Sequence, residues 1–241
     1  MAVARTARID RAHHVGASAR AIDLRLSGDE TLGFVGGQYV IVDTGVDLPN
    51  GKRAKRAYSI ASSDCEQHGF RLIVKLVQPG HGSHAMHSMA EGSTVTFSGP
   101  WGKYVPDALA TGDALVFATD TGITAAIGLL RGSGFAHVRA GVRVVWYTCG
   151  DDDFVPESFV RDALGPFAER LTVEPALAVD HPERAVHALQ AALRHDARGT
   201  AFLSGDGAVV HPVRDALVAR GVQTDQVRLE SFFNNPARKS P

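Results

Sequence analysis

The segment ALVFATDTGITAAI, residues 114–127, contains the strand-to-helix junction that decides the fold of this chain. Residues 114–118 are apolar, as in a buried strand, and a helix is predicted from about residue 123 to residue 131. The small residues between them are typical of the turn by which a parallel strand enters a helix, where dinucleotide pyrophosphates bind. The turn has one glycine and places Asp120 near the expected phosphate, so alone it is a weak signal.

The same alternation of apolar strands and helices continues to the end of the chain. We predict strands at residues 142–147, 171–173, 200–203 and 227–229, and helices at about residues 156–164, 182–193 and 208–219. Strands that are apolar on both faces and alternate with helices indicate a parallel sheet covered on both sides.

The first hundred residues have a different pattern, in which short strands follow one another between turns rich in Gly and Pro. The predicted strands are residues 21–26, 38–43, 56–61, 70–77 and 94–98, with one short helix at about residues 83–90. Such closely spaced strands indicate a small antiparallel barrel of the Greek-key type. We therefore predict two domains, an antiparallel β-barrel over residues 1–105 and an α/β nucleotide-binding domain over residues 106–241.

The composition excludes several classes of protein. The 241 residues include 25 Lys and Arg and 26 Asp and Glu, and this balance argues against a nucleic-acid binder. Cys65 and Cys149 are the two cysteines, too few for a disulfide scaffold or a four-cysteine zinc or iron–sulfur site. No apolar run reaches the roughly 20 residues of a membrane span. The chain starts without the apolar core of a signal peptide, so we expect a cytoplasmic protein.

Two motifs in the first half carry groups suited to a phosphorylated planar cofactor. Arg56-Ala57-Tyr58-Ser59 offers a guanidinium for a pyrophosphate, an aromatic face for a ring and a hydroxyl for a ring nitrogen. A strand with one exposed basic residue is the alternative. Gly80-His81-Gly82-Ser83 opens the short helix, with glycines that let an anion approach and Ser83 as the expected N-cap.

The same helix carries three histidines, His81, His84 and His87, spaced three residues apart. Histidines at this spacing can share a helix face, but no carboxylate or thiol completes a ligand set. We therefore predict a surface face and no metal site.

Two further motifs fall at the ends of late strands in the second half. Leu203-Ser204-Gly205-Asp206-Gly207 is another strand-to-helix turn, and Leu229-Glu230-Ser231-Phe232-Phe233 ends the last strand. Carboxyl ends of parallel strands meet at one sheet edge, so Glu230 and the two aromatic residues would face whatever the earlier turns hold. Simple packing of the phenylalanines on the core is the alternative.

Taken in order, six motifs resemble those of the ferredoxin–NADP reductase superfamily, whose members have a flavin-binding barrel followed by a nicotinamide-dinucleotide domain. The match runs over nearly the whole chain. The six motifs are Gly37-Gln38-Tyr39, Arg56-Ala57-Tyr58-Ser59, Gly82-Ser83-His84-Ala85-Met86-His87, Gly99-Pro100-Trp101-Gly102, Thr121-Gly122-Ile123-Thr124 and Glu230-Ser231-Phe232.

The resemblance implies roles for the matched residues. The expected catalytic residues are Ser59, near the flavin N5 position, and Glu230, which polarises the site or relays a proton. The expected contacts to FAD are Arg56, Ala57, Tyr58, Ser59, Gly82 and Ser83, and Val74, Lys75 and Gly80 are further expected cofactor contacts. The expected contacts to the nicotinamide coenzyme are Thr121, Gly122, Thr124, Ser204, Gly205 and Phe232.

The chain departs from the family pattern at the nicotinamide turns. Asp120 and Ala125 stand where the family usually has glycine and proline, and Ser204 stands where many members have cysteine. Asp206-Gly207 replaces a continuation that contains proline. These changes leave the fold prediction intact and weaken the expectation of tight nicotinamide binding.

The reaction implied by the resemblance is hydride transfer from NAD(P)H to FAD, followed by electron delivery to a ferredoxin or the iron–sulfur component of an oxygenase. The alternatives are an NAD(P)H-dependent flavin or ferric-chelate reductase and a flavin-binding electron-transfer subunit with weak nicotinamide use. NADH is slightly favoured because Asp151, Asp152 and Asp153, after the second strand of the sheet, would repel the 2′-phosphate of NADPH. A solvated acidic loop is the alternative. The basic residues between Lys52 and Arg56 would steer an acidic ferredoxin, or simply form a solvated strand edge.

Overall fold

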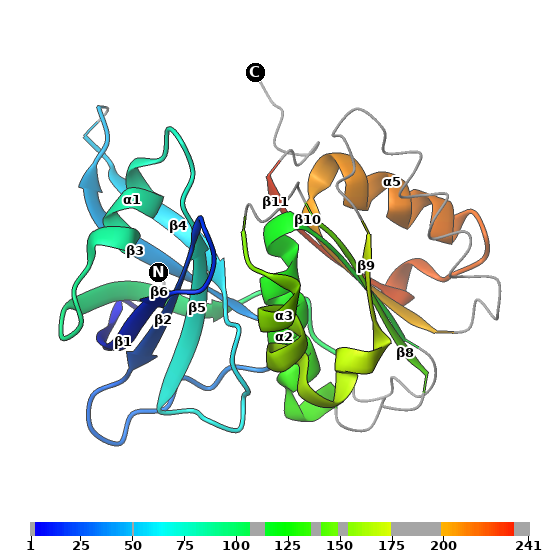
Figure 1. The fold of residues 1–241 in the computed structure, drawn as a ribbon, viewed down its shortest axis with the longest axis horizontal. Coiled ribbons are helices and arrows are strands. Elements are labelled where there is room, and N and C mark those ends of the chain that lie inside the picture. The colour runs from blue at the N-terminus through cyan, green and yellow to red at the C-terminus, as the bar shows by residue number, and fades with distance from the viewer. Residues whose placement is uncertain are drawn as a thin grey trace.

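The computed structural model describes residues 3–49, 51–106, 114–135, 141–148, 154–174 and 199–233. An antiparallel sheet of six strands forms the first part of the chain, and a parallel sheet of five strands with helices forms the second (Figure 1). The predicted fold class is therefore confirmed. The predicted boundary at residues 105/106 lies between the last strand of the first sheet and the first strand of the second.

The first sheet has the strand order β4-β3-β6-β1-β2-β5. Its strands are β1 (Arg5–His14), β2 (Ala19–Arg25), β3 (Tyr39–Asp47), β4 (Arg53–Ser59), β5 (Gly69–Lys75) and β6 (Thr94–Trp101). Five of them overlap the predicted strands, and β1 was not predicted. The apolar residues of the sheet, including Ile9, Ile22, Leu72 and Phe97, form one buried core.

The edge strands β4 and β5 contact each other but share no hydrogen-bonded ladder in the part of the chain that the structure describes. Helix α1 (His81–Ser88) packs against β3, β4 and β5 beside this gap (Figure 1). An edge strand presents unpaired backbone N–H and C=O groups, so the gap offers hydrogen-bonding groups to a ligand.

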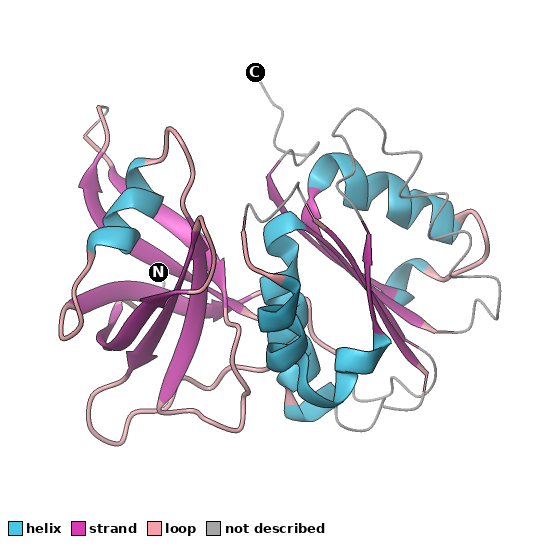
Figure 2. Cartoon of the chain, viewed as in Figure 1, coloured by secondary structure: helices cyan, strands magenta, loops and turns pink. Residues whose placement is uncertain are grey.

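The second sheet has the strand order β11-β10-β7-β8-β9. Its strands are β7 (Ala114–Thr119), β8 (Val142–Tyr147), β9 (Leu171–Glu174), β10 (Thr200–Asp206) and β11 (Val227–Phe233). Helices α2 (Ile123–Arg131) and α3 (Glu157–Leu164) lie on one face and α5 (Gly207–Val218) on the other (Figure 2). The four short 3₁₀ segments described are η1 (Asp120–Gly122), η2 (Ser133–Phe135), η3 (Gly165–Arg170) and η4 (Thr224–Gln226). The helix predicted at residues 182–193 lies outside the described residues.

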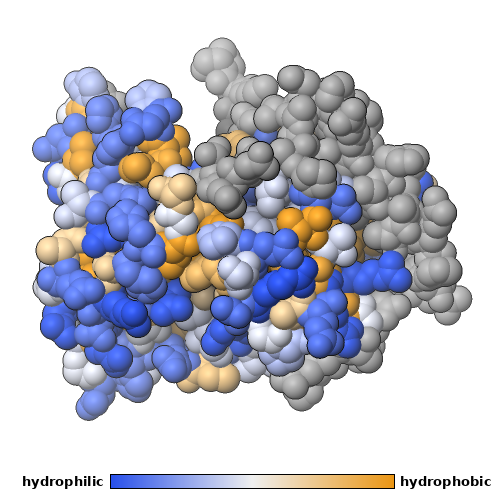
Figure 3. Space-filling view, viewed as in Figure 1, coloured by the Kyte–Doolittle hydropathy of each residue, from blue (hydrophilic) through white to orange (hydrophobic). Residues whose placement is uncertain are grey.

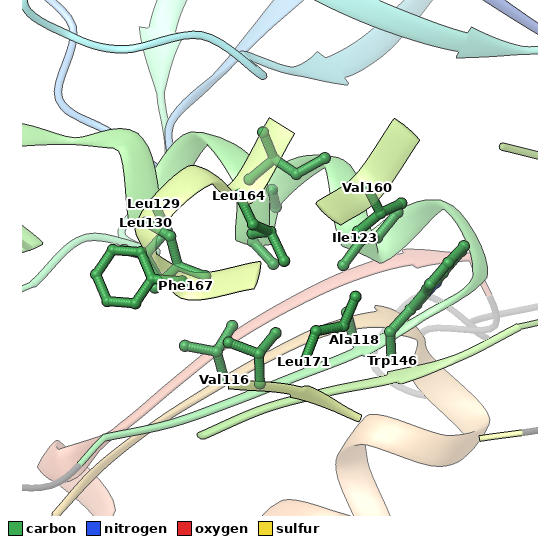
Figure 4. Close-up of a cluster of buried hydrophobic side chains, with 14 of the residues drawn as sticks. Val116, Ala118, Ile123, Leu129, Leu130, Trp146, Val160, Leu164, Phe167 and Leu171 are labelled. Atoms are coloured by element: carbon green, nitrogen blue, oxygen red, sulfur yellow. The ribbon is translucent and has the colours of Figure 1, made fainter. Parts of the chain in front are cut away.

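Coverage of both faces explains the apolar strands of the second half. Every residue of β7 is buried. Figure 4 shows Val116, Ala118 and Trp146 of the sheet facing Ile123 and Val160 of the covering helices. A second cluster on the other face packs α5 against β7 and β10.

The two domains meet through the backbone of α2, which lies between the barrel and the second sheet (Figure 1). A methyl group at Gly128 would lie 1.9 Å from the carbonyl oxygen of Ile60, and one at Gly36 would lie 2.5 Å from the carbonyl oxygen of Gly128. Side chains at these positions would push the domains apart. The seam is therefore a direct backbone-to-backbone contact.

Asp64 fastens this seam with its carboxylate. Its two oxygens accept hydrogen bonds from the backbone N–H of Gly36 (2.9 Å), in the barrel, and of Ser133 (2.7 Å), just after α2. Asp64 is 8% exposed, so both hydrogen bonds are shielded from water. Ser63 adds a hydrogen bond from its hydroxyl to the carbonyl oxygen of Arg131 (3.0 Å).

Hydrophilic side chains cover most of the described surface in the view of Figure 3. Among the described residues, no helix is both long and apolar enough to cross a membrane. The expected cytoplasmic location stays a prediction.

Candidate active site

The side chain of Arg56 lies against the first turn of α1. A methyl group at Gly82 would lie 3.0 Å from Cγ of Arg56 and 3.3 Å from Cγ2 of Thr44, so glycine allows this close approach. Arg56 is exposed, and its guanidinium donates a hydrogen bond to the carbonyl oxygen of Lys55 (2.8 Å). An exposed cation beside the N–H groups of a helix start is an arrangement that binds phosphate.

Ser83 does not cap the helix, so that expectation was wrong. The helix begins two residues earlier, at His81, with Gly80 at the N-cap. The Ser83 hydroxyl accepts a hydrogen bond from the backbone N–H of Val77 (3.1 Å) and donates one to the carbonyl oxygen of Gly80 (2.9 Å). It thus orders the loop before α1, and phosphate contacts by Gly80 and Ser83 stay predictions.

The three histidines of α1 have different surroundings. His81 and His84 are exposed, whereas Nε2 of His87 lies 2.8 Å from the carbonyl oxygen of Val74 on β5. Burial lowers the pKa of His87, and its ring lies 5.8 Å from that of His14. His87 therefore ties α1 to the barrel. Within the described ranges, no three His, Cys, Asp or Glu residues are placed to hold a metal ion.

The rest of the Arg56 motif ends β4, with Ala57 exposed, Tyr58 half-buried and Ser59 only 6% exposed. Burial raises the pKa of Tyr58 to about 12, against the opposing charge of Arg56. The phenol is therefore neutral at any physiological pH. Ser59 pairs with Tyr39 of the Gly37-Gln38-Tyr39 motif, so two of the six motifs are neighbours.

The basic stretch before this motif is partly neutralised. Arg53 forms ion pairs with Asp43 (3.3 Å) and Asp47 (3.1 Å) on β3. The expected basic patch from Lys52 to Arg56 is therefore weaker than its sequence indicates.

The second half of the site lies where β7 and β10 end side by side. The chain leaves β7 toward β8 and β9 and later returns to β10 on the other side of β7, which makes this pair the topological switch point of the sheet. Ligands of open parallel sheets bind in the crevice outside the strand ends at such a point. A methyl group at Gly122 would lie 2.3 Å from the carbonyl oxygen of Ser204, so the two turns touch through their backbones.

The other residues of these turns mostly hold the turns together. The Thr124 hydroxyl donates to the carbonyl oxygen of Thr121 (2.8 Å), which closes the first turn of α2. Gly205 has a φ of 126° and lies against Thr119, whose hydroxyl accepts a hydrogen bond from the backbone N–H of Asp206 (2.8 Å). Their contacts to a coenzyme stay predictions.

Lys75 and Asp120 form an ion pair that joins the two domains. The ammonium of Lys75, at the end of β5, lies 2.9 and 3.2 Å from the two carboxylate oxygens of Asp120, directly after β7. Asp120 has a φ of 46°, and its carbonyl oxygen accepts a hydrogen bond from the indole N–H of Trp146 (3.0 Å). The sequence predicted Lys75 as a cofactor contact, but nothing in it linked Lys75 to Asp120.

Glu230 is half-buried and lies beside a buried polar cluster at the same edge. In the β10–β11 ladder it is paired with Ser204, whose hydroxyl donates to the carbonyl oxygen of Gly122 (3.0 Å) and accepts from the Tyr104 hydroxyl (3.3 Å). Oε2 of Glu230 is buried without a hydrogen-bond partner, and burial raises the pKa of Glu230 to about 8. The group is therefore mostly a neutral carboxylic acid at pH 7.

Tyr104 was not among the predicted site residues. It follows the Gly99-Pro100-Trp101-Gly102 motif and is buried, and burial raises the pKa of its hydroxyl. Phe232 is half-buried and packs against the core of the second domain, as the packing alternative expected. Whether Phe232 also lines the coenzyme pocket stays a prediction.

The run of Asp151, Asp152 and Asp153 lies outside the described residues.

Comparison with known proteins agrees with this geometry. Residues 6–105 match the family described as oxidoreductase FAD-binding domain. Ferredoxin–NADP reductase B of Sorangium cellulosum is 32% identical over 149 residues, which cover 62% of this chain and 59% of that protein. The ferredoxin reductase component of 3-ketosteroid-9-alpha-monooxygenase from Mycolicibacterium smegmatis is 26% identical over 178 residues, which cover 73% of this chain and 50% of the relative. The chain thus spans little more than half the length of these relatives.

Solved structures share the fold at lower identity. Phthalate dioxygenase reductase superposes with a TM-score of 0.74 at 20% identity, covering 94% of this chain and 67% of that one. The ferredoxin reductase of carbazole 1,9a-dioxygenase superposes with a TM-score of 0.76 at 18% identity, covering 96% and 70%. The resemblance read from the six motifs is confirmed: residues 6–105 match the oxidoreductase FAD-binding domain family, and the chain shares the two-domain fold of reductases such as phthalate dioxygenase reductase.

Proposed function

We propose that this chain is a flavin-dependent reductase that takes electrons from NAD(P)H and passes them through bound FAD to a ferredoxin or to the iron–sulfur component of an oxygenase. The contact of Arg56 with Gly82 at the start of α1 carries the proposal, because it places a cation and helix N–H groups beside the unpaired edge of β4. The names of the relatives, a ferredoxin–NADP reductase and a ferredoxin reductase component, support the same class of partner.

The residues present fit the two cofactors. On the barrel, the exposed Arg56 guanidinium and the narrow space over Gly82 suit a pyrophosphate. At the sheet, Oε2 of Glu230 is a buried polar atom without a partner, as expected where a ligand supplies the missing hydrogen bond.

When bound, FAD accepts a hydride from the dihydronicotinamide and releases its electrons singly. The chain supplies binding, orientation and protons. Arg56 neutralises phosphate charge, and Ser59 holds a hydroxyl at the buried end of β4. Glu230, neutral at pH 7 because of burial, can donate a hydrogen bond from its carboxyl group, which a charged carboxylate cannot do.

Reconstitution with FAD tests the proposal directly. Purified protein should become yellow, and its visible flavin absorption should bleach when NADH is added without oxygen. Arg56→Met should weaken FAD binding by roughly tenfold or more, since it removes a charge-assisted hydrogen bond. Lys55→Met, on the neighbouring exposed residue of the same strand, is the matched control and should keep the wild-type affinity. Colourless protein, or equal losses in the two variants, would refute the proposal.

The acceptor and the coenzyme need separate assays. NADH oxidation should be faster with a ferredoxin than with free flavin or a ferric chelate, and the reverse order would favour the alternative reductase. The preference for NADH rests on Asp151, Asp152 and Asp153 and is tested by kcat/KM for NADH and NADPH. Yellow protein that NADH and NADPH fail to bleach would instead be a flavin-binding electron-transfer subunit.

A further inference from the structure

Asp120 is an unexpected residue for a dinucleotide turn. It follows β7 at the topological switch point, where an anionic pyrophosphate would approach the N-terminus of α2. Its side chain is only 9% exposed, so water screens its charge poorly. It is also the non-glycine residue with a positive φ among those described, a conformation that Asp and Asn tolerate better than most residues. An unopposed carboxylate here would repel the coenzyme.

Lys75 opposes that charge from the other domain. Its ammonium contacts both carboxylate oxygens of Asp120, and its side chain is 19% exposed. The indole N–H of Trp146 fixes the backbone of Asp120 from the adjacent strand β8. The pair is therefore held from both domains, and the charges of its two side chains cancel.

We propose that Lys75 and Asp120 together set the affinity of this chain for the nicotinamide coenzyme, with Asp120 as a positioning residue that holds the Lys75 ammonium at the turn and offsets its charge. The inference rests on the proposed function and adds to it the residues that tune coenzyme binding. It predicts effects of opposite sign: freeing the ammonium favours an anionic ligand, and freeing the carboxylate disfavours it.

Two near-isosteric variants separate these effects. Asp120→Asn removes the charge, keeps the side-chain size and still tolerates the positive φ. Lys75→Met keeps most of the side-chain length and leaves the carboxylate without its partner. Titration calorimetry on the FAD-loaded protein with NAD⁺ and with ADP-ribose measures binding without turnover, and ADP-ribose isolates the pyrophosphate half of the coenzyme.

The Kd of both ligands should fall about fivefold in Asp120→Asn and rise about fivefold in Lys75→Met. The double variant should return to within about twofold of wild type, because it again sums to zero charge at the turn. Binding to Asp120→Asn should also weaken more steeply with added salt than binding to wild type. A purely structural role of the pair would not produce changes of opposite sign.

The Asp23–Arg71 pair supplies the control. It joins β2 to β5 within the first domain at 2.6 and 2.9 Å, and Asp23→Asn or Arg71→Met should leave both Kd values unchanged. Wild-type binding with equal shifts, or none, in the two test variants would overturn the inference while leaving the proposed function standing. Should Lys75→Met fail to fold, the Kd and the salt dependence of Asp120→Asn decide alone. Wild type that binds neither ligand would refute the proposed function itself.

Discussion

Replacement of Asp64 by Ala should loosen the attachment of the two domains. The carboxylate accepts two short hydrogen bonds, from Gly36 in the barrel and from Ser133 after α2, and the residue is buried. A hydrogen bond to a charged group contributes about 1.5–3 kcal/mol, so losing both costs about 3–6 kcal/mol of unfolding free energy. For a chain of this size, that loss lowers Tm by roughly 10 °C.

Scanning calorimetry is the suitable assay, because it also shows whether one transition divides into two. We expect Asp64→Ala to separate the unfolding of the barrel from that of the second domain, since the bond to Ser133 crosses the seam. Asp64→Asn keeps one acceptor oxygen but turns the other position into a donor that faces an N–H group. It should therefore lose about half of the stability lost by Asp64→Ala.

Asp29 provides the matched control. It is an exposed aspartate for which the described residues provide no hydrogen bond or ion pair, and Asp29→Ala should leave Tm unchanged. If Asp64→Ala melts as a single transition at the temperature of Asp29→Ala, the carboxylate does not hold the seam and the reasoning is wrong.

Three further predictions concern the site. Because the native state keeps a proton on Glu230 that the unfolded chain releases between about pH 4.5 and pH 8, stability should fall as pH rises through this window. Glu230→Gln should remove this dependence of the unfolding free energy on pH and should be more stable than wild type, by on the order of a few kcal/mol, at and above pH 8. If urea unfolding gives the same dependence of stability on pH for both proteins, Glu230 is not a buried neutral acid. Gly122→Ala places a methyl group 2.3 Å from the carbonyl oxygen of Ser204, so coenzyme affinity should fall more than about tenfold while FAD is retained. A Kd for NAD⁺ equal to that of wild type would count against a coenzyme site at the switch point. Ser59→Ala should keep FAD and slow its reduction by NADH, and stopped-flow rates equal to wild type would remove Ser59 from the mechanism.

The parts of the fold with a strong apolar pattern were predictable from the sequence. Helix α2 was predicted at residues 123–131 and is observed at Ile123–Arg131, because eight of its nine residues are buried between two layers. Strand β1 was missed for the opposite reason. Arg5–His14 lies inside the sheet between β6 and β2, yet only Ala7 and Ile9 are buried, so it carries little hydrophobic signal.

The contacts of the candidate site residues were predictable where the motif is local and not where partners are distant in sequence. Arg56 and Gly122 lie in short motifs, and the structure places both in close backbone or helix-start contacts. Tyr104 contacts Ser204, and Lys75 contacts Asp120, across the fold. A single sequence carries no periodicity that marks such pairs. The error at Ser83 was smaller, because the helix begins two residues before its predicted start, with Gly80 as the N-cap.

The glycines at the seam between the two domains limit how this protein can be re-engineered. Gly36 and Gly128 bring main chains together without intervening side chains. A domain taken from a relative would therefore pack here only if it also had glycine at the corresponding position. In chimeras with alanine at either position, the added methyl group should hold the two domains farther apart. Whether exchanged domains pack together thus depends more on the absence of side chains at these two positions than on the chemistry of the surrounding residues.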